Sequence, residues 1–192
     1  MRRLTVSLMA VAALAASPQL RAQESTTLGA FELRPLVGAF IPTGSMRNEF
    51  RDAMLVGIQG GFEFSSDIHL LLGGFWSRND THASVVGSRQ ADIWQFDAGL
   101  EANLIRSMGR DWFFRPFVGG GLGMRTYDYA ATASSNQCFA GYGSVGAEAQ
   151  RFEGAFRLEA RNYISCYESP LTGVKKTRND LGLTLGFVYH VM

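Results

Sequence analysis

The stretch Trp94-Gln95-Phe96-Asp97-Ala98-Gly99-Leu100-Glu101-Ala102-Asn103-Leu104 alternates strictly between two kinds of residue. Its even positions are apolar, and its odd positions are polar or glycine. Successive side chains of a β-strand point to opposite faces, so this pattern predicts a strand with one apolar and one polar face. Alternation of the same kind, in places weaker, predicts eight strands in all: 31–42, 53–64, 67–77, 90–105, 112–127, 138–150, 154–165 and 179–191.

The joints between these strands alternate in length. Tight or short joints are expected at 65–66, 106–111 and 151–153, and longer, more polar ones at 43–52, 77–89, 128–137 and 166–178. In an up-and-down barrel this order places the long joints at one end and the short joints at the other. Outer-membrane barrels have that asymmetry. The predicted fold is therefore all-β, an eight-stranded antiparallel up-and-down transmembrane β-barrel.

The charges decide which face of the wall points inward. A charge on the lipid face costs about 2–4 kcal/mol at the midplane, whereas an inward charge can pair with a neighbour. Eight strands leave room inside only for side chains. We therefore expect a closed lumen filled by a paired polar network, with members Glu63, Asp97, Glu101, Arg115, Glu148, Arg157, Glu159 and Arg161. The apolar parity, including Phe96, Leu100 and Leu158, is expected to face lipid.

Composition excludes several classes of protein. Of the 192 residues 46% are hydrophobic and only 18% are charged, which excludes a disordered chain. A net charge of +1 provides no electrostatic footprint for nucleic acid. No stretch approaches the ~18 consecutive apolar residues of a transmembrane helix. One apolar, aromatic-rich β domain remains.

The N-terminus predicts export. Arg2 and Arg3 precede an apolar run at 8–16, and the small residue Ala22 follows, which is the order of a secretory signal peptide. We expect residues 1–22 to be removed and residues 23–192 to form the barrel. Cys138 and Cys166 are an even pair in an exported chain, which favours a disulfide. They are almost equidistant from the turn near residue 152, so we expect them to lie nearly opposite each other at the loop end of one hairpin.

The C-terminal stretch Thr184-Leu185-Gly186-Phe187-Val188-Tyr189-His190-Val191-Met192 resembles the targeting signal of bacterial outer-membrane barrels, which usually ends on Phe. Thr184, Gly186, Tyr189 and Val191 occupy its polar, glycine, aromatic and hydrophobic places. The mature chain as a whole resembles the small outer-membrane β-barrels of the outer-membrane protein A and X type. The resemblance implies a location in the bacterial outer membrane, contact with its lipid and lipopolysaccharide, and insertion by the barrel-assembly machinery.

Three motifs suggest chemistry, and each has a plainer explanation. Gly141, Gly143 and Gly146 have the spacing of a dinucleotide fingerprint, but that motif requires a following helix, and the alternation continues as a strand. Asp80, His82 and Ser84 supply the residue types of a hydrolase triad within one polar joint that offers no rigid support.

Lys175-Lys176-Thr177-Arg178 is a basic cluster that would pair with lipopolysaccharide phosphates or simply be solvated. The three histidines are scattered along the chain, so no metal ligand set, cofactor site or catalytic residue is predicted.

The leading hypothesis is a structural or interaction protein of the outer membrane, without enzymatic activity, that displays four surface loops from a closed barrel. Two alternatives remain open: a lipid A-modifying barrel enzyme, and a soluble lipocalin-like carrier of a small apolar ligand. A lipocalin would turn its apolar face inward and its charges outward.

Overall fold

The computed structural model describes residues 30–65, 67–85, 88–104, 106–107, 112–129, 135–151, 154–168 and 175–191. Their elements, in chain order, are β1 (Phe31–Pro42), the 3-10 helix η1 (Gly44–Asn48), β2 (Ala53–Ser65), β3 (Ile68–Val85), β4 (Ser88–Asn103), β5 (Arg106–Ser107), β6 (Phe113–Tyr129), β7 (Ser135–Arg151), β8 (Gly154–Glu168) and β9 (Lys175–Val191). The predicted signal peptide, residues 1–22, lies outside this part of the chain. No helix in the described ranges is long and apolar enough to cross a membrane.

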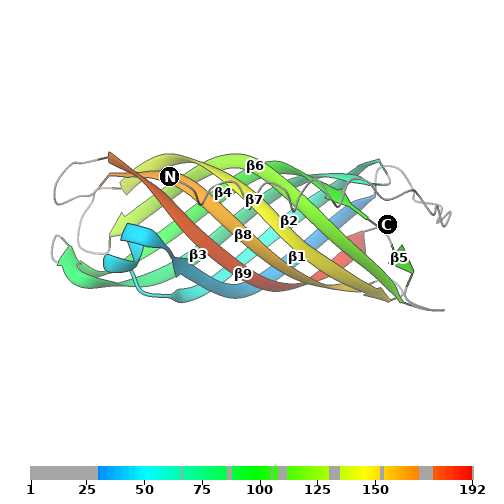
Figure 1. Cartoon of the computed structure of the whole chain (residues 1–192), viewed down its shortest axis with the longest axis horizontal. Coiled ribbons are helices and arrows are strands. Elements are labelled where there is room, and N and C mark those ends of the chain that lie inside the picture. The colour runs from blue at the N-terminus through cyan, green and yellow to red at the C-terminus, as the bar shows by residue number, and fades with distance from the viewer. Residues whose placement is uncertain are drawn as a thin grey trace, which may run out of the picture.

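The eight long strands form one closed antiparallel barrel (Figure 1). Each pairs with its sequence neighbour, β4 pairs directly with β6, and β1 pairs with β9 to close the ring. The two-residue β5 pairs with the start of β6. We call the end that carries η1 the loop end and the end that carries the first residue of β1 the turn end. The predicted fold class is confirmed.

The strands are longer at the loop end than the sequence predicted. The pairing of β3 with β4 continues through Asp80↔Gln90 to Val85↔Ser88, and β8 pairs with β9 beyond Cys166↔Thr177. The joints expected at 77–89 and 166–178 are therefore mostly strand. The predicted alternation of joint lengths is wrong at the β3–β4 connection, because polar residues there continue the strand pairing instead of forming a long loop.

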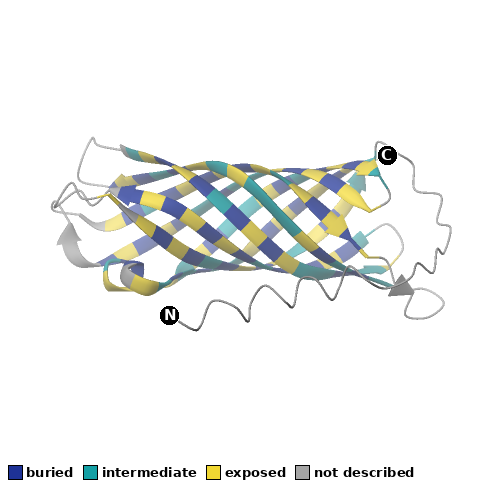
Figure 2. Ribbon diagram, turned by 45° about the horizontal axis from the view of Figure 1, so that its top comes forward, coloured by how far each residue is buried: buried dark blue, intermediate teal, exposed yellow. Residues whose placement is uncertain are grey.

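Burial alternates along the strands, as Figure 2 shows by its blue and yellow segments. Outward apolar side chains are exposed to 59% at Phe96, 57% at Leu100 and 62% at Leu158, while Glu101 and Arg157 are fully buried. Exposed apolar surface around a buried charged interior is the reverse of a soluble barrel. It is the arrangement that a lipid environment requires.

Inward glycines make space for large lumen side chains. A Cβ on Gly99 would lie 2.3 Å from the hydroxyl of Tyr142, and one on Gly121 would lie 2.2 Å from the carbonyl oxygen of Ala98. The glycine-rich middle of β6 thus lets neighbouring backbones and the Tyr142 ring approach closely.

Candidate functional site

All eight residues of the predicted lumen network are buried inside the barrel. They come from five strands, β2, β4, β6, β7 and β8, and project inward because each has the inward parity of its strand. Seven of the eight belong to ion pairs. The eighth, Glu63, is 5% exposed, and its Oε1 has no hydrogen-bond partner among the described residues.

The ion pairs form a continuous ladder that starts at the turn end. His190 Nε2 lies 3.0 Å from Glu32 Oε1, and Arg34 Nη2 lies 2.5 Å from Glu32 Oε2. Arg34 Nη1 then donates to Glu101 Oε1 at 3.0 Å, and Glu101 also accepts from Arg157. The carboxylate of Glu101, on β4, is thereby shared by Arg34 of β1 and Arg157 of β8. These ion pairs connect β4 to strands on the other side of the barrel.

Arg157 is the centre of the ladder. Its Nη1 lies 2.5 Å from Glu148 Oε1, and its Nε lies 3.0 Å from Glu159 Oε2. The other carboxylate oxygen of Glu159, Oε1, lies 2.7 Å from Arg161 Nη2, and Arg161 Nη1 lies 2.9 Å from Asp97 Oδ2. Charged hydrogen bonds between fully buried partners are among the strong interactions of proteins, because little water screens them.

The arginines are also stacked on aromatic rings. The guanidinium carbon of Arg157 lies 3.6 Å from the Phe117 ring centroid, and that of Arg161 lies 4.2 Å from the Tyr142 centroid. Such cation–π contacts gain strength when they are desolvated. Rings and ion pairs together fill the section of the lumen between Glu32 and Asp97.

Sequence reasoning missed part of the charged interior. Arg178 and Asp180 were expected in a solvated joint and at a strand start, but both point inward from β9 with exposures of 2% and 0%. Asp180 Oδ2 lies 2.5 Å from Arg125 Nη1, and Arg178 Nη2 lies 2.6 Å from Glu49 Oε1. The even-numbered parity of β9 was the available signal. It was hidden because Lys175 and Lys176 made the segment look like a basic loop.

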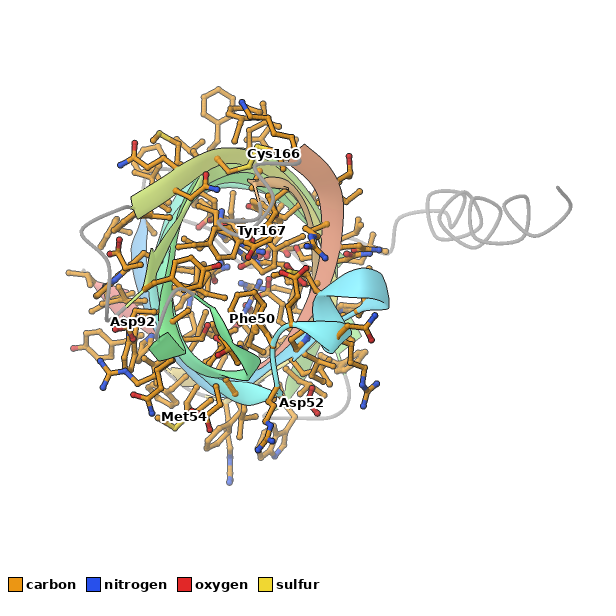
Figure 3. The ribbon with its side chains drawn as sticks, turned by 90° about the vertical axis from the view of Figure 1, so that its left-hand side faces the viewer. Phe50, Asp52, Met54, Asp92, Cys166 and Tyr167 are labelled. Atoms are coloured by element: carbon orange, nitrogen blue, oxygen red, sulfur yellow. A yellow bond between two sulfur atoms is a disulfide. The ribbon has the colours of Figure 1, made fainter. Side chains whose placement is uncertain are left out.

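The loop end of the lumen holds an apolar cluster beside these ion pairs, which corrects the expectation of a polar lumen throughout. Met46 and Phe50, from the segment between β1 and β2, are 0% and 1% exposed. Phe50 lies inside the ring of strands in Figure 3, and its ring centroid is 6.2 Å from that of Tyr167 and 6.4 Å from that of Tyr127. A joint predicted to be a surface loop therefore folds inward and closes this end.

The predicted disulfide between Cys138 and Cys166 is present, with a Cα–Cα distance of 5.6 Å. It joins β7 to β8 at the loop end, as expected. The register pairs Ala140 with Ser165, so the two cysteines are offset by one position, which agrees with the nearly opposite placement that the sequence predicted. The reason for the offset is that the hairpin is centred between residues 152 and 153.

The remaining sequence motifs do not come together as sites. Gly141, Gly143 and Gly146 lie within β7, where no helix follows to hold a phosphate. Asp80 is in β3 and accepts from Gln90 Nε2 at 3.3 Å, while the side chains of His82 and Ser84 lie outside the described residues.

The basic cluster 175–178 is the start of β9, and its Arg178 points inward. Within the described ranges, no three His, Cys, Asp or Glu residues are placed to hold a metal ion.

Comparisons with known proteins bear on the fold alone. No family model matches the sequence, and no curated protein matches it. Among solved structures, Neisserial surface protein A is similar with a TM-score of 0.63 at 11% identity, covering 84% of this chain and 98% of that one. The outer membrane protein OprG from Pseudomonas aeruginosa is similar with a TM-score of 0.57 at 15% identity, covering 85% and 96%.

The fold is thus that of small eight-stranded outer-membrane barrels, and the resemblance found in the sequence is confirmed at the level of fold. The predicted location in a bacterial outer membrane agrees with this fold and with the exposed apolar exterior.

Proposed function

We propose that the chain is a closed, non-conducting barrel of the bacterial outer membrane that serves a structural or interaction role and has no enzymatic activity. One observation carries the proposal: inward side chains occupy the lumen at the turn end, in the middle and at the loop end. The ladder from His190 to Asp97 fills the turn end and the middle, and Met46 and Phe50 fill the loop end. An eight-stranded barrel leaves room inside only for side chains, so a lumen occupied in this way offers no open path for hydrated ions.

Two alternatives receive less support. A lipocalin-like carrier requires an apolar interior and a charged exterior, and the faces here are reversed, with Leu158 62% exposed and Arg157 fully buried. A lipid A-modifying enzyme requires an oriented acid, base and nucleophile. No observation on the described residues favours that arrangement.

The proposed contacts are with the membrane and its assembly machinery. Tyr189 and Val191 of β9 point outward with exposures of 54% and 43%, which leaves the alternating C-terminal signal accessible for recognition during insertion. Above the apolar band, Lys175 and Arg78 are exposed at the loop end, where lipopolysaccharide phosphates would lie, and Arg78 is also paired with Asp92. We also propose that residues 1–22 are removed on export.

Ion flux across a bilayer tests the proposal. Purified full-length protein is reconstituted into vesicles loaded with a self-quenching anionic dye and with salt, and insertion is checked by flotation. We expect vesicles with the barrel to release ions no faster than protein-free vesicles, whereas vesicles with an open porin empty. Release of ions in proportion to the amount of inserted barrel would contradict the closed lumen.

A further inference from the structure

The inward residues change character along the barrel. Beyond the ladder, toward the loop end, the wall presents Phe40, Leu55, Phe75, Ile93 and Tyr127, all 5% exposed or less. We call this region the loop-end chamber. An apolar chamber is not needed to keep the barrel closed, since the ladder below it already fills the lumen.

A short segment of the chain occupies the chamber. Residues 43–52, here called the plug, contribute Met46 and Phe50 to the buried cluster that the wall residues form. Figure 3 shows Phe50 inside the ring of strands. The second residue of the plug is Gly44, whose φ of 55° lies in the left-handed region that glycine adopts without strain. The plug is therefore an insertion built on a glycine turn, and an isolated antiparallel bridge between Phe50 and Thr81 joins it to β3.

Polar contacts hold the plug mainly at its two ends. The Thr43 amide donates to the carbonyl oxygen of Asn179 at 3.3 Å, and Arg51 N donates to the carbonyl oxygen of Asp80 at 2.9 Å. Between them, Glu49 pairs with Arg178 at 2.6 Å while its side chain is 31% exposed. Arg178 is itself buried, so water reaches this ion pair from the Glu49 side, whereas both partners of the ladder pairs are buried.

Beneath the plug lies a small cavity lined in part by Phe40, Phe75, Gln95, Arg125 and Tyr163. Two polar atoms at this floor have no hydrogen-bond partner among the described residues, Gln95 Nε2 and the hydroxyl of Tyr163, although both side chains are at least 97% buried. A buried polar atom left unpaired is costly, and a guest that hydrogen-bonds to it recovers that cost. The charge of Arg125 is already matched by Asp180, so the floor favours a neutral guest.

From these observations we propose that the loop-end chamber is a binding site for a small neutral aromatic molecule with one hydrogen-bonding group. The plug opens to admit it, the ring takes the place of Phe50 among the wall side chains, and the polar group pairs with Tyr163 and Gln95. The ladder stays closed below, so the molecule is held and does not pass through. Binding and ion flux are measured in separate experiments, so a negative result in one of them does not contradict the other proposal.

Equilibrium dialysis of labelled phenol and toluene against the full-length barrel in lipid nanodiscs, with empty nanodiscs as the blank, tests the site. We expect saturable binding of both probes to the wild type. Tyr163→Phe keeps the ring and removes the hydroxyl. Phenol then loses one neutral hydrogen bond and should bind up to about tenfold more weakly, while the affinity for toluene should be unchanged. Glu49→Gln removes the ion pair with Arg178 and raises the open fraction, so both probes should bind several-fold more tightly.

Leu71→Ala is the matched control, because Leu71 is fully buried in the lumen away from the plug. Its truncation makes a cavity without loosening the plug and should leave the affinity for both probes unchanged. Absence of saturable binding by both the wild type and the folded Glu49→Gln protein would overturn the proposal. So would equal phenol affinity in wild type and Tyr163→Phe, or tighter binding by Leu71→Ala than by Glu49→Gln.

Discussion

Removing the central arginine should weaken the barrel more than any single surface change. Arg157→Met keeps most of the side-chain volume and its packing on Phe117, but it deletes the charge that Glu101, Glu148 and Glu159 share. Each of these carboxylates is at most 1% exposed, so none can turn to water.

The expected magnitude follows from the partners that remain. Glu101 keeps Arg34 at 3.0 Å and Glu159 keeps Arg161 at 2.7 Å, whereas Glu148 keeps, among the described residues, only Arg115 at 3.7 Å. One carboxylate is thus left nearly uncompensated. Breaking a buried pair in this way costs about 3–5 kcal/mol.

Urea unfolding in lipid vesicles, followed by far-ultraviolet circular dichroism, measures this change in the free energy of unfolding. Arg78→Met is the matched control, because Arg78 makes an ion pair with Asp92 at 2.9 Å but is 55% exposed. Its unfolding midpoint should stay near that of the wild type, since exposed pairs contribute little. If Arg157→Met unfolds at the same urea concentration as Arg78→Met, the lumen charges are solvated and the ladder does not hold the wall together.

Three further predictions concern other parts of the barrel. Glu159→Ala removes one partner each from Arg157 and Arg161 and should lower the free energy of unfolding by a few kcal/mol in the same urea assay; an unchanged midpoint would contradict its pairing. Gly121→Ala places a methyl group 2.2 Å from a backbone oxygen and should cost about 1–3 kcal/mol, whereas Gly143→Ala, with nothing within 4 Å of its Cβ, should be neutral; equal midpoints would count against the packing described. Replacing both disulfide cysteines by serine should cost about 2–4 kcal/mol and leave the fold intact, and alkylation of the exported wild type should find no free thiol.

The sequence predicts the wall of the barrel well because the two faces of each strand contact different media. Lipid on one side and packed charge on the other impose a strict alternation of apolar and polar residues, which is legible at Phe96, Asp97, Leu100 and Glu101. The inward direction of the charges follows from the cost of a charge in hydrocarbon. Both inferences use local pattern alone.

The loop end was harder to predict for two reasons: the alternation of apolar and polar residues weakens there, and a joint between two strands folds into the lumen. Above the apolar band both faces of a strand contact water or protein, so the alternation fades although the hydrogen-bonded ladder continues through Asp80↔Gln90. Met46 and Phe50 are apolar residues in a polar joint, which hinted at an inward fold. The ring partners of Phe50, Tyr127 and Tyr167, belong to strands 70 or more residues away, and no local pattern reveals such a contact.

The central claim is that the apolar face of this barrel contacts lipid. Spin labels attached through single introduced cysteines at positions 96, 158 and 185, in protein reconstituted into bilayers with the native disulfide intact, report collisions with oxygen and with a water-soluble nickel chelate. The native residues there, Phe96, Leu158 and Leu185, are 55–62% exposed. We predict frequent collisions with oxygen and rare collisions with nickel at all three, and the reverse at position 47 of the loop end. Nickel collisions at positions 96, 158 and 185 as frequent as at position 47 would contradict the claim, because the apolar face would then lie in water.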